Sequence, residues 1–142
     1  MVRIVDVGSP FDAPIGKVGK RVEMHAHELP EIHPDVQHPK LERVGENQGV
    51  IGYVMERNGQ KSPIQMRTTT LSPLAQVREH LDGPLGGSKV ISYYIAKGDK
   101  TAVTVVADFE SPMLTAPQLE AAAHDLLDRG FDQDRAFLKK MR

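Results

Sequence analysis

Residues 89–110 read KVISYYIAKGDKTAVTVVADFE, and this stretch decides the fold. Apolar and polar side chains alternate on both sides of Gly98-Asp99, as they do in strands that bury one face. The pattern predicts two antiparallel strands, Lys89–Lys97 and Thr101–Glu110, joined by a tight turn. We expect the buried face of this hairpin to carry Ile91, Tyr93, Ile95, Val103, Val105 and Ala107.

The chain before this hairpin continues the strand pattern. Asn58-Gly59 separates two of these strands and is a strong signal for a two-residue hairpin turn. Strands joined by short links form an antiparallel meander. The first residues, Met1–Val7, predict one more strand, which Gly8-Ser9-Pro10 should end. The remaining strands are predicted at Lys40–Val44, Gly49–Arg57, Pro63–Leu71 and Leu74–Leu81.

The end of the chain has helical spacing instead. Residues Thr115–Arg142 predict one long helix, because apolar residues recur along it every three or four positions. Thr115 and Gln118 have the spacing of a capping box, and Gly130 should kink the helix. A second amphipathic stripe begins at Ile15 and predicts another helix. Prolines after Leu29 prevent this helix from continuing.

Composition excludes several classes of protein. The chain has 142 residues, which suits a single domain over residues 1–142. Lysine and arginine total 18 against 19 aspartates and glutamates, so no basic excess indicates a nucleic-acid partner. The absence of cysteine removes disulfides, thiolate metal sites and cysteine nucleophiles. No apolar run suits an integral membrane segment or a signal peptide, and we expect a cytoplasmic protein.

Three stretches resemble the START-like or SRPBCC superfamily. They are Phe11–Val18, Leu29–Val36 with Ile32 where relatives carry Trp, and Gly86–Tyr94 followed by Thr101–Phe109. The resemblance implies an α+β helix-grip fold, in which a curved antiparallel sheet wraps around a long C-terminal helix and encloses an apolar cavity. Members include lipid-transfer, coenzyme Q-binding and polyketide cyclase proteins, so it also implies a hydrophobic small molecule as partner.

A cavity between sheet and helix would be lined by the inward residues of both. Its apolar walls with a few hydroxyls would suit a lipid-, quinone- or polyketide-like ligand and would require no cofactor. The alternative is a solid core made of the same residues. The predicted ligand-binding residues are Tyr53, Met55, Met66, Thr68, Tyr93, Val105, Ala123, Leu126 and Leu127.

An enzyme of polyketide cyclase or aromatase type is a second possibility. Glu79 is in register with Val77, so it is predicted to face the interior, while Arg67 and Arg78 face outward. A buried Glu79 beside Tyr53 or Tyr93 could act as a general base. The alternative for Glu79 is an exposed position or a salt bridge.

A histidine cluster is the third candidate. His25, His27, His33 and His38 are interleaved with carboxylates, and imidazole and carboxylate together are ligands for zinc. Their spacing matches no recognised metal motif. The alternative is a solvated, pH-sensitive polar face near the mouth of the cavity.

Overall fold

The computed structural model describes residues 1–24, 36–57, 59–71 and 74–140. Over these residues, seven strands form one sheet in the order β1-β7-β6-β5-β4-β3-β2, and every neighbouring pair is antiparallel. The elements are β1 (Val2–Phe11), α1 (Ile15–Met24), β2 (Val36–Arg43), β3 (Gln48–Arg57), β4 (Gln60–Leu71), β5 (Ala75–His80), β6 (Lys89–Lys97), β7 (Lys100–Phe109) and α3 (Ala116–Lys140).

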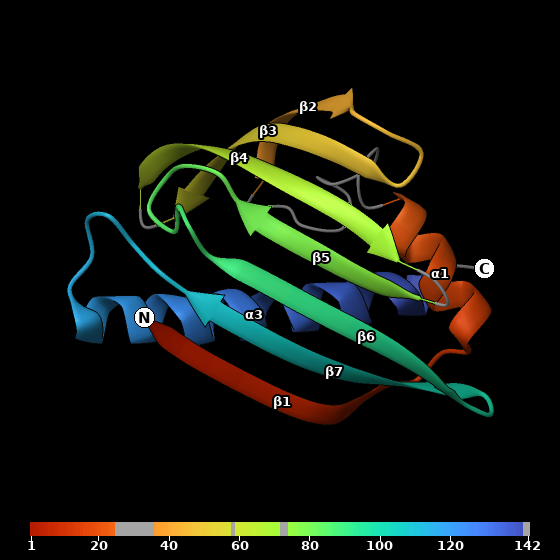
Figure 1. Ribbon diagram of the computed structural model, residues 1–142. Coiled ribbons are helices and arrows are strands. Elements are labelled where there is room, and N and C mark those ends of the chain that lie inside the picture. Colours follow the sequence, from red (N-terminus) through yellow and green to blue (C-terminus); the bar gives the residue numbers. More distant parts are fainter. Residues whose placement is uncertain (25–35, 58, 72–73, 141–142) are drawn as a thin grey trace.

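The sheet is strongly curved, and α3 runs along its concave face (Figure 1). Helix α1 packs at one end of the sheet, beside the C-terminal part of α3 (Figure 1). The predicted α+β architecture, a curved antiparallel sheet around a long C-terminal helix, is therefore confirmed. Curvature of this kind follows from the twist of antiparallel strands, which lets a single sheet cover a helix.

The predicted turns and the helix cap are also present. The β3–β4 hairpin pairs Arg57 with Gln60, and the β6–β7 hairpin pairs Lys97 with Lys100, so each turn has two residues. At the start of α3, the Thr115 N–H donates to Gln118 Oε1 (2.9 Å), and the Gln118 N–H donates to Thr115 Oγ1 (3.4 Å). These reciprocal bonds are the capping box predicted from the sequence.

The largest errors in the predicted strand ends are in β1 and β2. Strand β1 continues through Gly8-Ser9-Pro10 to Phe11, because a bulge between Asp6 and Ser9 absorbs Gly8 at a φ of 75°. Pro10 is tolerated because β1 is an edge strand. Strand β2, the other edge, begins at Val36 rather than Lys40. Helix α3 is continuous through Gly130, where we expected a kink.

The buried side chains form three separate clusters rather than one continuous core. The first surrounds α1 and includes Phe11, Val18 and Leu138. The second lies under β2–β4 and is built around Ile51. The third packs the first half of α3 on β6 and β7 and includes Phe109. This division leaves room for a hollow between the clusters.

Candidate ligand-binding cavity

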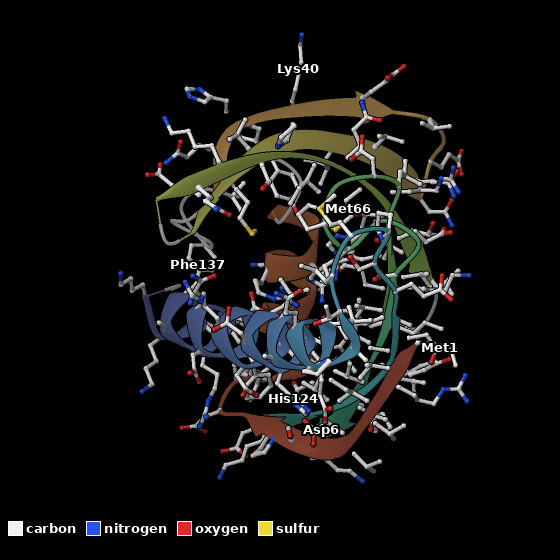
Figure 2. The ribbon with its side chains drawn as sticks, turned by 90° about the vertical axis from the view of Figure 1, so that its left-hand side faces the viewer. Met1, Asp6, Lys40, Met66, His124 and Phe137 are labelled. Carbon is white, nitrogen blue, oxygen red and sulfur yellow. The ribbon has the colours of Figure 1, made fainter. Side chains whose placement is uncertain are left out.

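A cavity of about 560 Å³ lies between the concave face of the sheet and α3. This volume is within the range of small-molecule sites, which is roughly 300–1,000 Å³. Its walls come from all seven strands of the sheet and from the middle of α3. Figure 2 shows Met66 inside the curve of the sheet, on the side that faces α3, and Lys40 pointing away from it.

Most of the predicted lining residues border this cavity, and two lie beside it. Ala123 is 0% exposed and belongs to the cluster between α3 and the sheet. Thr68 pairs with Arg78 across β4 and β5, so it faces the same side of the sheet as the cavity. The predicted residues that line the cavity are Tyr53, Met55, Met66, Val105, Leu126 and Leu127.

The placement predicted for Tyr93 is wrong. Tyr93 lies on the outer face of β6 and is 45% exposed, whereas Ser92 and Tyr94 line the cavity. The cause is the pairing of β6 with β7, in which Tyr94 is opposite Val103 and Ser92 is opposite Val105. Opposite residues in an antiparallel pair share a face, so the inward residues of β7 bring Tyr94 inward and send Tyr93 outward.

The placement predicted for Glu79 is also wrong, and with it that of Arg78. Glu79 forms an ion pair of 3.6 Å with Arg67 on the outer face, as the cross-strand pairing of these two residues requires. Arg78 instead lines the cavity. Glu79, Tyr53 and Tyr93 are therefore not brought together, because only Tyr53 faces the interior. The proposed general-base arrangement has no basis in the structure.

His80 is a cavity residue that the sequence did not single out. It is 6% exposed and follows Arg78 on the inner face of β5. Burial lowers the pKa of His80 from 6.5 to about 4, and the positive charge of Arg78 acts in the same direction. The imidazole is therefore neutral at pH 7. In the sequence, Gln76, Arg78 and His80 alternate with other residues and therefore share one face of the strand. Because all three are polar, that face was expected to be exposed.

A buried polar network includes two residues of the cavity wall, Tyr94 and Asp134. Arg21 of α1 is 1% exposed, and its Nη1 lies 3.1 Å from Asp134 Oδ1 on α3. Its Nη2 donates to Tyr94 Oη at 2.8 Å. Burial acts to lower the pKa of Arg21, but Tyr94 and Asp134 outweigh it and raise that pKa above its ordinary value. This network joins both helices to β6.

The predicted metal site is largely outside the described residues. His25, His27 and His33 fall in residues 25–35, which are not described. His38 lies on β2, is exposed and has a φ of 53°. Among the described residues, no group of three or more histidine, aspartate or glutamate side chains could hold a metal ion. The zinc site therefore remains a prediction.

Comparison with known proteins gives the fold. No protein-family model matches the chain, and no curated protein matches it. Among solved structures, a START superfamily protein from Mycobacterium smegmatis is similar with a TM-score of 0.83 and 12% identity, over 99% of each chain. The chain has the START-like helix-grip fold. The Zhui aromatase/cyclase from Streptomyces sp. R1128 is similar with a TM-score of 0.80 and 12% identity, over 98% of this chain and 92% of that one.

The START-like fold is shared with proteins of different kinds. Ara h 8.0201 is similar with a TM-score of 0.76 and 13% identity, over 99% of each chain. Identities this low establish the fold alone, so the function has to be argued from the cavity. In the described part of the chain, neither helix has the length and apolar character that a membrane span requires.

Proposed function

We propose that this protein binds a hydrophobic small molecule in the cavity between its sheet and α3. The observation that carries the proposal is the 560 Å³ hollow with side chains such as Met55, Met66 and Leu127 on its walls. A ligand that buries roughly 200–300 Å² of apolar surface gains about 5–8 kcal/mol from leaving water, before the entropy cost of association. That is enough for reversible binding.

The alternative of a solid core is not favoured by the packing. Protein interiors normally pack to a density of about 0.75, with few voids larger than a water molecule. Here the three buried clusters are separate, and partly buried side chains such as Leu126 and Phe131 line the space between them. Met55 and Met66 give the wall flexible side chains that can adapt to the shape of a ligand.

The test is identification of what the protein retains, combined with a variant that fills the cavity. Val105 lines the cavity, whereas Val106 is its neighbour on the outer face of β7. We expect native mass spectrometry of the purified protein to show a bound organic mass, and Val105→Phe to lose it. Val106→Phe is the matched control and should retain it. A wild-type protein that neither retains a mass nor binds any apolar probe would overturn the proposal.

A cyclase-type activity is the second candidate, and one observation favours it. The neutral imidazole of His80 faces the cavity, and a neutral histidine can transfer protons. The structural similarity to the Zhui aromatase/cyclase points in the same direction. The test is incubation with a synthetic oligo-β-ketone, followed by the absorbance of the aromatic product. Acceleration that His80→Gln removes would support this activity, and no acceleration by the wild type would exclude it for that substrate.

A further inference from the structure

The middle of the sheet presents a polar strip to an otherwise apolar cavity. Gln76, Arg78 and His80 alternate along the inner face of β5. Cross-strand pairing places Thr68 opposite Arg78 and Ser92 opposite Gln76. Arg78, His80 and Ser92 line the cavity directly, and Gln76 is fully buried beside them. The strip thus lies on the central strand of the sheet, facing α3.

Several buried polar atoms of this strip are unpaired. Four of them have no hydrogen-bond partner among the residues that the structure describes: Arg78 Nε, His80 Nδ1, Thr68 Oγ1 and Gln76 Oε1. Buried polar groups are normally paired, and leaving one unpaired costs about 1–3 kcal/mol. Four such atoms on neighbouring positions of one face indicate a surface that is completed by a bound molecule.

The charge of Arg78 is the decisive feature. Arg78 forms no ion pair with any residue that the structure describes, whereas the other arginine inside the fold, Arg21, contacts both Asp134 and Tyr94. Partial burial of an unpaired guanidinium is costly, and a carboxylate is one of the groups that match its fork of N–H donors. Within the described residues, the charge of Arg78 therefore has no carboxylate to neutralise it.

None of the described carboxylates that line the cavity is paired with Arg78. Those that line the cavity come from β1 and α3, which form other parts of its wall. Asp134 is already paired with Arg21, and Asp6 accepts a hydrogen bond from Ser9. Asp128 and Asp132 are exposed residues of α3. In Figure 2, Asp6 lies on the opposite side of α3 from Met66, which is paired with His80.

We propose that the ligand is an apolar acid whose carboxylate is bound by Arg78 at the centre of the sheet. Thr68 lies opposite Arg78 on β4, and His80 lies two positions along β5, so the Thr68 hydroxyl and the His80 ring can contribute further hydrogen bonds. The apolar body then lies against the remaining wall, where Met66 and Leu127 are exposed to the cavity. This inference rests on the proposed function and narrows it to one class of ligand.

The experiment compares acids with neutral molecules of the same shape. Isothermal titration calorimetry would use laurate against dodecanol as the flexible pair, and naphthoate against methyl naphthoate as the planar pair. We expect the acid to bind roughly ten- to hundredfold more tightly in at least one pair, which is the usual effect of a charge-assisted hydrogen bond. Arg78→Gln should remove the preference, whereas Arg67→Gln on the outer face should leave it unchanged.

A second measurement on the unaltered protein covers the case in which Arg78→Gln does not fold. The side-chain Nε–H resonance of Arg78, assigned by comparison with Arg78→Lys, should shift on addition of the acid and not of its neutral partner. Equal binding of acid and neutral partner, or an unchanged resonance, overturns the inference and leaves the proposed function standing. If none of the four probes binds, both the proposed function and the preference for an acid are overturned for fatty and planar aromatic ligands.

Discussion

Arg21 on α1 and Asp134 on α3 form a buried ion pair, with 3.1 Å between Nη1 and Oδ1. The same guanidinium donates to Tyr94 Oη on β6. One side chain therefore connects the two helices and the sheet at the end of the cavity. Because the Arg21 side chain is removed from water, it depends on Tyr94 and Asp134 for these hydrogen bonds.

The first prediction concerns this ion pair. Arg21→Met removes the cation that faces the buried Asp134 carboxylate, and breaking a buried ion pair in this way typically costs about 3–5 kcal/mol. We expect the free energy of unfolding in urea to fall by that amount. The double variant Arg21→Met/Asp134→Leu should recover much of the loss, because it removes both charges. A single variant within about 1 kcal/mol of the wild type would show that the pair does not matter for stability.

The second prediction is a dependence of stability on pH that originates at His80. Its pKa is about 4 in the folded protein and 6.5 ordinarily, so the unfolded chain binds the extra proton first. Stability is therefore fully present above about pH 6.5 and is lost as the pH falls from there toward 4. The lowered pKa corresponds to about 3 kcal/mol, which should appear as a fall in the urea midpoint across this interval.

A matched variant distinguishes the contribution of His80 to the pH dependence of stability from that of carboxylates, whose ordinary pKa values lie near pH 4. His80→Gln cannot titrate and keeps a polar side chain of similar size. Its stability should be nearly constant between pH 6.5 and 5, where the wild type is already losing stability. The same slope in both proteins would assign the effect to other groups.

The fold could be predicted from local signals because those signals agree with one another. Asn58-Gly59 and Gly98-Asp99 fix two hairpins, and the capping box at Thr115 fixes the start of α3. The ends of β1 were missed because Gly8-Ser9-Pro10 normally stops a strand, and only the bulge beside Asp6 lets β1 continue.

The apolar half of the site was predictable, and the polar half was not. The rule that apolar residues face inward placed Tyr53, Met66 and Val105 correctly. On β5 the same rule chose the side of Val77 and Glu79, whereas the strand turns Arg78 and His80 inward. Because the inner face of β5 carries polar side chains, a rule based on hydrophobicity assigns the wrong face to this strand.

The two-residue turn at Gly98-Asp99 contained information that would have corrected β6. It pairs Lys97 with Lys100, and counting back from there places Tyr94 opposite Val103. An inward Val103 therefore requires an inward Tyr94 and an outward Tyr93. The register set by a hairpin turn is a stronger constraint than the hydrophobicity of a strand whose two faces are similar.

The third prediction tests the capping box. Thr115→Ala removes the hydroxyl that accepts from the Gln118 N–H and should destabilise the protein by about 0.5–2 kcal/mol in urea unfolding. Thr115→Ser retains the hydroxyl and is expected to stay close to the wild type. Helix α3 also forms one wall of the cavity. Fraying of its first turn should therefore lower ligand affinity, and a helix that does not fray should bind as the wild type does. Equal stability of the Ala and Ser variants would contradict a capping role.

The last prediction concerns Gly130, which borders the cavity in the middle of α3. A Cβ atom at this position would meet nothing within 4 Å, and the backbone there is helical. Gly130→Ala should therefore stabilise the protein by about 0.5–1 kcal/mol, because alanine loses less backbone entropy in a helix. Thermal unfolding should show a rise of roughly 2–4 °C for a chain of this size.

The exposed residue Ala136 on the same helix provides the reverse substitution. Ala136→Gly should lower stability by a similar amount, which calibrates the effect of helix propensity in α3. If Gly130→Ala instead destabilises the protein while Ala136→Gly behaves as expected, α3 must bend at Gly130 in solution. A bend at Gly130 would move the part of the cavity wall formed by Leu126 and Leu127 relative to the rest of α3. Gly130→Ala would then also slow ligand binding. Stopped-flow fluorescence can measure this rate.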